Sequence, residues 1–224
     1  MADQSIIIVG VGSGLSAAVA RRFTRAGFRV GLISRTAASL DEVADGVNAA
    51  AGTRPSVHTA DAGDTVSLTT AWNALSKELG PPAVAVYNAA GYEPFGSPTT
   101  IAPDQFASSL AITVTGALVT AQLAAPAMRD AQHGTILITG GGLATHPSAR
   151  AAALAAGKAA VRNLAFTLAE ELEPDGIHVA TVTISGTIKE GTPFDPDRIA
   201  DVYWALHGEP HGSWTTERPY GMEG

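Results

Sequence analysis

Ser5-Ile-Ile-Ile-Val-Gly-Val-Gly-Ser-Gly-Leu15 joins five strand-forming residues to a glycine-rich turn and then to the start of a helix. Beyond the turn, apolar residues recur at the three- and four-residue intervals of one helix face. They are Leu15, Ala18, Val19, Phe23 and Ala26. Backbone N–H groups and the helix dipole at such a turn can receive a pyrophosphate. A tight turn also favours glycine for its own sake, so both interpretations stay open at this point.

The same alternation of short apolar runs and helical periods continues along the chain, as in parallel sheets covered by helices on both faces. We predict strands at 5–9, 30–33, 56–60, 83–87, 135–139 and 177–184, with an edge strand at 213–217. We predict helices at 15–26, 37–50, 64–79, 103–129, 150–173 and 196–206. The pattern indicates an α/β fold over residues 1–224: a single doubly wound Rossmann-type domain with a mostly parallel, about seven-stranded sheet and a short C-terminal substrate-side segment.

Composition limits the classes of partner. Cysteine is absent, which excludes a disulfide framework and fits a reducing compartment, so we expect a cytoplasmic protein. The net charge is −7 and the basic residues are scattered, which argues against nucleic acid. The apolar run at 6–9 lacks a basic flank and is too short for a signal peptide or a membrane span, so no membrane partner is expected.

The glycine-rich loop resembles that of a known family. Val9-Gly-Val-Gly-Ser-Gly-Leu-Ser16 is similar to the T-G-x-x-x-G-I/L-G loop of the short-chain dehydrogenase/reductase family, from which it departs at Val9 and Ser16. The resemblance covers most of the chain and implies a nucleotide cofactor. Its phosphate-binding loop would consist of Gly10, Gly12, Ser13, Gly14 and Leu15.

Residues after later strands extend the cofactor site that this resemblance implies. Asp61 and Ala62 resemble the adenine-contacting pair of the family, although Asp61 could equally serve a turn or a helix cap. After the fourth strand, the family's N-N-A-G is matched by Asn88, Ala89, Ala90 and Gly91. Ser185-Gly186-Thr187-Ile188 takes the place of the family's Pro-Gly loop, which puts Gly186 and Ile188 beside the nicotinamide.

The residues after the second strand bear on the choice of cofactor. Ser34, Arg35 and Thr36 occupy the position where an acidic residue would bind a ribose 2′-hydroxyl. No acid is present there, and a guanidinium with two hydroxyls suits a 2′-phosphate. The sequence therefore favours NADP(H) over NAD(H), the alternative being that Arg35 is only a solvated residue at a strand end.

The catalytic positions that the resemblance implies depart from the family. Lys158 matches the lysine of the family's Tyr-x-x-x-Lys pair, but Leu154 stands at the tyrosine position. Gly141, thirteen residues before Leu154, takes the place of the serine, and Thr113 takes that of the asparagine. Lys158 can still hydrogen-bond the nicotinamide ribose. A proton for the substrate must come from another group, from water, or be unnecessary, as with a preprotonated iminium.

Two other residues are candidates for that proton transfer. His146 lies in the loop after the fifth strand and can titrate near neutral pH, and Tyr92 follows Gly91 at the carboxyl edge of the sheet. Each has a structural alternative, as a loop residue or as pocket wall. His207 and His211 lie close in the sequence, but the segment between them contains Gly208 and Pro210, so we predict no metal site.

The sequence supports two functions. The favoured one is an NADP(H)-dependent oxidoreductase that transfers hydride to or from a small carbonyl, alcohol or imine substrate with a non-standard proton donor. The alternative is a catalytically inactive relative that binds NADP(H) as a sensor or structural subunit. The alanine-rich helix at 150–173 has small side chains that allow close helix packing, so we expect a homo-oligomer, a dimer or a tetramer. Because the segment after Gly186 is short, the substrate pocket is expected to be shallow or open.

Overall fold

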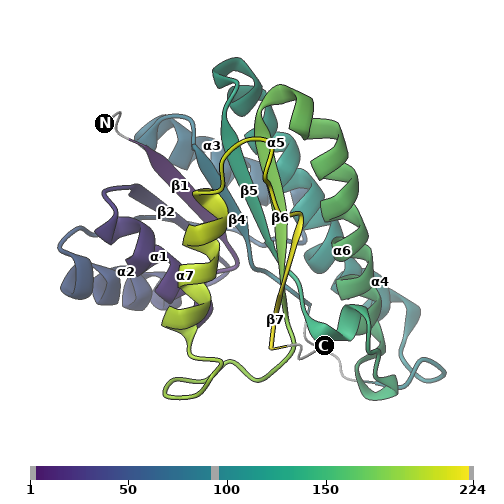
Figure 1. The fold of residues 1–224 in the computed structure, drawn as a ribbon. Helices are drawn as coiled ribbons and strands as arrows, with labels where there is room; N and C mark the ends of the chain where they lie inside the picture. Colours follow the sequence, from purple (N-terminus) through teal and green to yellow (C-terminus); the bar gives the residue numbers. More distant parts are fainter. Residues whose placement is uncertain (1–3, 92–95, 222–224) are drawn as a thin grey trace.

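The computed structural model describes residues 4–91 and 96–221. Its centre is a seven-stranded sheet in the order β3-β2-β1-β4-β5-β6-β7, in which every neighbouring pair is parallel. Helices cover both faces of the sheet (Figure 1). The predicted α/β class and doubly wound topology are confirmed. The chain order reverses between β1 and β4, and open sheets of this kind bind ligands outside the carboxyl ends of the strands at such a point.

The bounds of the elements agree with the predicted ranges within a few residues, except at the edge strand and at the helix predicted over 103–129. The strands are β1 (Ser5–Val9), β2 (Arg29–Ser34), β3 (Ser56–Thr59), β4 (Val84–Tyr87), β5 (Gly134–Thr139), β6 (Ile177–Ile184) and β7 (Glu217–Tyr220). The helices are α1 (Leu15–Arg25), α2 (Ala37–Ala51), α3 (Thr65–Leu79), α4 (Pro103–Leu110), α5 (Gly116–Ala131), α6 (Ala152–Leu172) and α7 (Pro196–His207). Asp64 caps α3, accepting hydrogen bonds from the N–H groups of Val66 and Ser67.

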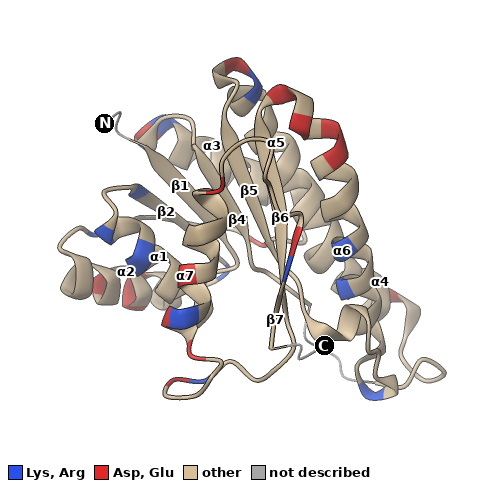
Figure 2. Cartoon of the chain, viewed as in Figure 1, with Lys and Arg blue, Asp and Glu red and all other residues tan. Residues whose placement is uncertain are grey.

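The core lies in two layers because side chains of a strand alternate between the two faces of the sheet. In β1, Ile6 and Ile8 pack into the layer beneath α1, α2 and α7. Ile7 and Val9 pack into the opposite layer, with residues of α3, α5 and α6. All four side chains are fully buried. Figure 2 agrees with this arrangement, since charged residues mark the outer helices while the central strands carry almost none.

The edge strand differs from the predicted one. We predicted a strand at 213–217, whereas β7 is Glu217–Tyr220 and pairs with β6 from Thr181 onwards. The residues before it form a loop held by Glu209, whose carboxylate accepts the N–H of Thr215 at 2.6 Å. Pro219 lies within β7, which an edge strand tolerates because one side needs no ladder hydrogen bonds.

The long helix predicted at 103–129 is divided in three. A π-helical turn, Ala111–Thr115, separates α4 from α5. Such turns often mark functional sites, and this one carries Thr113. By length and composition the whole run from Pro103 to Ala131 could cross a membrane. Of its most apolar stretch of 18 residues, 44% is buried inside the fold. A core helix meets the same criterion, and in this fold α5 packs on the sheet through residues such as Ala121 and Ala124.

Candidate active site

A cavity of about 1240 Å³ opens along the carboxyl ends of the strands. Its lining joins the glycine-rich loop after β1 to the segment after β6, so that nearly all the implied cofactor residues lie in one space. The lining includes Gly10, Gly12, Gly14, Leu15, Ser34, Arg35, Asp61, Ala62, Asn88, Ala89, Ala90, Gly91, His146, Lys158, Gly186 and Ile188. Ser13 and Thr36 were also expected at the cofactor, but they are outside this lining.

The loop after β1 has a fixed conformation that requires glycine at its first position. Gly10 has a φ of 86°, and a Cβ there would lie 2.2 Å from the backbone nitrogen of Ala89. The Oγ of Ser16 donates to the carbonyl of Gly10 at 2.9 Å, and the Nδ2 of Asn88 donates to the same carbonyl at 3.1 Å. Ser16, a departure from the family pattern, thus helps to hold the turn, since its hydroxyl also accepts from Asn88 at 2.6 Å.

The next two glycines form a cradle that fits a ligand. A Cβ added at Gly12 or at Gly14 would meet nothing within 4 Å, so packing within the protein does not explain the absence of a side chain. Gly14 is the N-cap of α1 and provides no side-chain cap. The first N–H groups of α1 therefore lack a side-chain acceptor at the cavity, which is the arrangement that receives a phosphate.

The end of the cavity near β2 and β3 carries Arg35 and Asp61. Arg35 is exposed, directly after β2, where its guanidinium is available to an anion. Asp61 lines the cavity and also accepts the N–H of Gly63 at 2.8 Å, so its carboxylate serves the turn while facing the ligand space. Thr36 is the N-cap of α2 and hydrogen-bonds the hydroxyl of Ser39, which accounts for its place outside the lining.

Lys158 lies at the other end of the cavity and is almost fully buried in α6. Its exposed fraction is 6%, and its Nζ donates to the main-chain carbonyl of Thr139 at 2.7 Å. Burial lowers the pKa of Lys158 to about 8, because an ammonium is poorly solvated there. The side-chain Oγ1 of Thr139 is hydrogen-bonded to the hydroxyl of Tyr203 at 2.7 Å, which links α7 to this end of the cavity.

The three residues that we predict to replace the family's catalytic groups lie close to Lys158 or to its neighbour Gly157. Leu154 lines the cavity one helical turn before it, and a Cβ on Gly141 would lie 3.6 Å from the Cε of Lys158. Thr113 is buried, and its Oγ1 accepts the N–H of Gly91 at 2.9 Å. Thr113 therefore holds the loop after β4 in place, and its buried side chain does not face the cavity.

The structure places only one of the two candidate proton donors, His146 and Tyr92. His146 lines the cavity, but it is exposed at the rim and its Nδ1 hydrogen-bonds the Oγ1 of Thr145 at 3.0 Å. Tyr92 lies outside the residues that the structure describes. Among the described lining residues, Lys158 is thus the only buried titratable group at this end of the cavity.

Ser185 lies in a loop that the sequence placed beside the nicotinamide, but no role was predicted for its side chain. Its Oγ is buried and has no hydrogen-bond partner within the described chain, and the residue lines the cavity at the end of β6. A Cβ on Gly142 would lie 2.7 Å from this oxygen. The available signal was its place directly after a buried parallel strand, where side chains reach the ligand edge.

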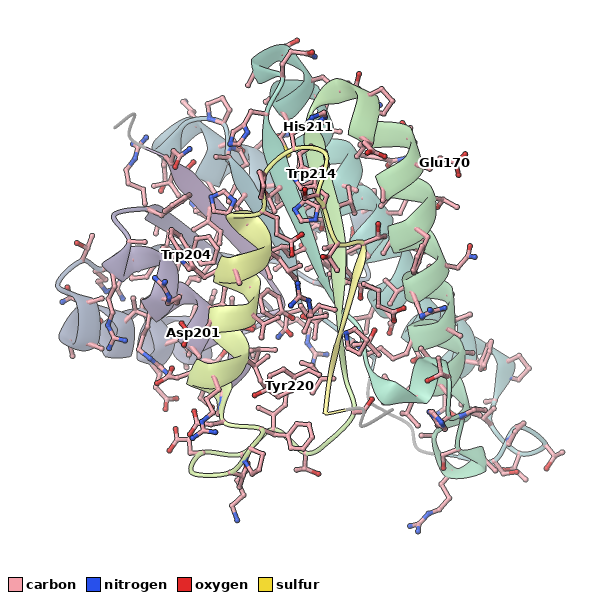
Figure 3. All side chains as sticks on the ribbon, viewed as in Figure 1. Glu170, Asp201, Trp204, His211, Trp214 and Tyr220 are labelled. Atoms are coloured by element: carbon pink, nitrogen blue, oxygen red, sulfur yellow. The ribbon has the colours of Figure 1, made fainter. Side chains whose placement is uncertain are left out.

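The segment from Ser185 to α7 is short and firmly held. The ring of Phe194 fills the space beside Gly186 and Gly221, where a Cβ would clash at 2.1 and 2.3 Å. Tyr220, labelled in Figure 3 at the end of β7, donates its hydroxyl to the carbonyl of Pro193 at 2.8 Å. This side of the cavity is therefore packed against β7 through Phe194 and Tyr220.

His207 and His211 lie beside the amino ends of the central strands, away from the cofactor cavity. Figure 3 shows His211 and Trp214 in this region. His207 hydrogen-bonds the Oγ1 of Thr135 through Nδ1 at 2.9 Å, and Trp214 stacks on His178 with 5.1 Å between ring centroids. Over residues 4–91 and 96–221, no three or more His, Cys, Asp or Glu side chains are grouped to hold a metal ion. These rings close a separate cavity of about 340 Å³.

Known proteins resemble this chain over most of its length. Residues 4–196 match the sequence pattern described as short chain dehydrogenase. A Xanthobacter autotrophicus protein named inactive 2-(S)-hydroxypropyl-CoM dehydrogenase 2 is 33% identical over 172 residues, which cover 76% of this chain and 71% of that protein. The very-long-chain 3-oxoacyl-CoA reductase of Aspergillus fumigatus is 30% identical over 187 residues, and 79% of this chain matches 51% of that enzyme. The chain thus spans about half the length of this fungal relative.

A solved structure gives the same fold. The crystal structure of a metagenomic short-chain oxidoreductase in complex with NADP superposes with a TM-score of 0.87 at 27% identity, covering 96% of both chains.

Proposed function

The chain belongs to the short-chain dehydrogenase family, and from this premise we propose that it is an NADP(H)-dependent oxidoreductase. It would transfer hydride between that cofactor and a small carbonyl, alcohol or imine substrate, with a proton donor other than the family's tyrosine. One observation carries the proposal: a single cavity contains the uncapped start of α1, Arg35 and Lys158. Together these can bind the phosphates, the adenosine and the nicotinamide ribose of one dinucleotide.

The preference for NADP(H) rests on Arg35. No carboxylate follows β2 at the position that would bind a ribose 2′-hydroxyl, and the exposed guanidinium can form charge-assisted hydrogen bonds with a 2′-phosphate. The metagenomic relative was crystallised with NADP, which is consistent with this choice.

Each part of the chain would have a defined task with the cofactor present. The bound nicotinamide supplies or accepts the hydride. The N–H groups at the start of α1 would hold the pyrophosphate, the ammonium of Lys158 the nicotinamide ribose, and the backbone of Ile188 the carboxamide. Leu154 would give the substrate an apolar contact, since a hydrocarbon side chain has no proton to donate.

The second candidate function is an inactive binding protein, a sensor or structural subunit. It is favoured by Leu154 and Gly141, which leave the positions of the family's tyrosine and serine without hydroxyls. The Xanthobacter relative is itself named inactive.

We further propose a cytoplasmic homo-oligomer, a dimer or a tetramer, that binds no nucleic acid and no membrane. The outer faces of α5 and α6 expose Leu118 by 36% and Phe166 by 40%, and α6 is rich in small side chains. A second copy packed there would remove these apolar groups from water.

One experiment separates the two functions. The purified protein is titrated with NADPH and with NADH by fluorescence, and a panel of carbonyl and imine compounds is then added while loss of reduced cofactor is followed. Tight NADPH binding with turnover supports the oxidoreductase. NADPH binding without turnover across the panel supports the inactive binder. Absence of binding contradicts both functions, because both depend on the same cavity.

A further inference from the structure

We propose that Lys158 is itself the proton donor, that Ser185 holds the substrate oxygen, and that the preferred substrate is consequently a neutral aldehyde or ketone. The inference rests on the proposed function above. It gives Lys158 a role beyond binding the ribose, and it narrows a substrate class that also included imines and alcohols.

The first step is the choice among the titratable groups at the cavity. Those on the described lining are Arg35, Asp61, His146 and Lys158. Arg35 and Asp61 follow β2 and β3, at the adenosine end, whereas Lys158 lies beyond β5 on α6. His146 is at the same side but is exposed at the rim, where water competes for its hydrogen bonds. Lys158 is the buried donor among these groups, with only 6% of its surface exposed to solvent.

The second step concerns access to the amine. A Cβ on Gly141 would lie 3.6 Å from the Cε and 3.7 Å from the Cδ of Lys158, so a side chain at this position would pack against the lysine. With glycine there, a substrate can reach the space that a side chain would occupy. Leu154 lines the same space and supplies no competing donor or acceptor.

The third step is the state of the amine. The ammonium has three N–H bonds, and the structure shows one of them donated, to the carbonyl of Thr139. Burial alone lowers the pKa of Lys158 to about 8, since no charged side chain among the described residues acts on it. On the far side of Thr139, its Oγ1 is hydrogen-bonded to the hydroxyl of Tyr203. An acid with a pKa close to the working pH both carries its proton and releases it readily.

The fourth step is the buried hydroxyl of Ser185. Its Oγ has no partner among the described residues, which is a costly arrangement for a buried polar group unless a ligand completes it. Gly142, next to Gly141, lies against Ser185, with 2.7 Å between a Cβ placed on the glycine and the Oγ. Ser185, directly after β6, and Lys158, on α6, therefore border the same pair of glycines. The hydroxyl missing at Gly141 is replaced by one from the neighbouring strand end.

The reaction balances with these groups. The carbonyl carbon accepts a hydride, for which the reduced nicotinamide is the source, and the π electron pair of the carbonyl moves to its oxygen. That oxygen takes a proton from the Lys158 ammonium, whose N–H electrons stay on Nζ, and the product is an alcohol. Solvent in the cavity then returns a proton to the neutral amine. A preformed iminium needs no proton and carries a positive charge, which a nearby ammonium repels.

The test uses the fact that the chain has only three lysines, Lys77, Lys158 and Lys189. Protein labelled with ¹³C at the lysine ε-carbons is titrated by NMR, and Lys77→Met and Lys189→Met assign the signals of the two exposed lysines. The signal of Lys158 should titrate with a midpoint near pH 8, within about one pH unit. A midpoint above pH 10 would overturn the proposal independently of any activity.

The second arm compares Lys158→Arg with Lys77→Met. Arginine keeps the charge and can donate to Thr139 and to the ribose, but it does not release its proton. We expect NADPH affinity within about threefold of the original and carbonyl reduction slower by about 100-fold or more, while Lys77→Met changes neither. Ser185→Ala should lower kcat/KM about tenfold, with Ser185→Thr recovering part of the loss.

The outcomes separate this inference from the proposed function. If Lys158→Arg folds, binds NADPH and still reduces carbonyls at the original rate, Lys158 is not the donor, although the oxidoreductase stands. Faster turnover of preformed iminium than of carbonyl by the original protein would contradict the substrate class. If the original protein does not bind NADPH at all, the proposed function itself fails. Should Lys158→Arg not fold, the NMR midpoint and the Ser185 variants still decide.

Discussion

Replacing Gly12 with alanine should abolish tight cofactor binding without destabilising the protein. A Cβ at this exposed position would meet no atom within 4 Å, and the φ of Gly12 lies outside the left-handed region that favours glycine. We therefore expect the free energy of unfolding to change by no more than about 0.5 kcal/mol. The added methyl would stand in the cradle at the start of α1. A phosphate held away from one or two N–H groups loses charge-assisted hydrogen bonds worth about 1.5–3 kcal/mol, which weakens binding about 10- to 150-fold.

Gly46 provides the matched control. It also has nothing within 4 Å of an added Cβ, but it lies in the interior of α2, away from the cavity. Gly46→Ala should stabilise the protein by about 0.5–1 kcal/mol and raise Tm by roughly 1–4 °C, because alanine loses less backbone freedom on folding. NADPH affinity should not change.

Thermal unfolding and NADPH titration of both variants form the assay. The reasoning is refuted if Gly12→Ala unfolds at a markedly lower temperature, since the position would then be packed. It is equally refuted if Gly12→Ala is stable and binds NADPH as tightly as the original protein, because the loop would then not hold the phosphates.

Three further predictions concern other parts of the molecule. Burial, with smaller contributions from His133 and His178, lowers the pKa of His207 to about 4, so the unfolded chain binds a proton between about pH 6.5 and pH 4 that the folded protein does not. Urea unfolding should therefore show full stability above pH 6.5 and a loss of at most about 3 kcal/mol by pH 4, and His207→Asn should flatten this dependence. Arg35→Ser should weaken NADPH binding about 10-fold or more while leaving NADH binding within about twofold, and equal losses for both cofactors would argue against a 2′-phosphate contact. Phe166→Glu should shift the protein towards the monomer in light scattering, whereas an unchanged mass would exclude this face of α6 as the interface.

The fold was largely predictable because it depends on local patterns. The run Ser5–Val9 is apolar at every position beyond its serine, as expected for a strand buried on both faces, and the glycines after it mark the turn. The edge strand β7 was misplaced because an edge strand needs only one apolar face and carries a weak pattern. The π-helical turn Ala111–Thr115 could not be predicted, since helical periodicity continues through it with only one extra residue.

The site was predictable where the backbone decides its form. Glycine spacing predicts the tight turn at Gly10, whose φ is positive, and the open cradle beyond it, while phosphate binding by this loop stays a prediction. The partners of Lys158 could not be found in this way. Lys158 contacts the main-chain carbonyl of Thr139 at the end of β5, and Ser185, which lines the same cavity, follows a separate strand, β6. Contacts between residues of separate elements depend on the order of strands in the sheet, which the hydrophobic periodicity of the sequence does not predict.

A crystal structure of the protein grown with NADP⁺ tests the central claim most directly. The account predicts the pyrophosphate on the N–H groups at the start of α1, the 2′-phosphate within hydrogen-bond distance of Arg35, and the nicotinamide ribose against the ammonium of Lys158. Crystals saturated with NADP⁺ whose cavity holds no dinucleotide, or in which it lies elsewhere, would contradict the account.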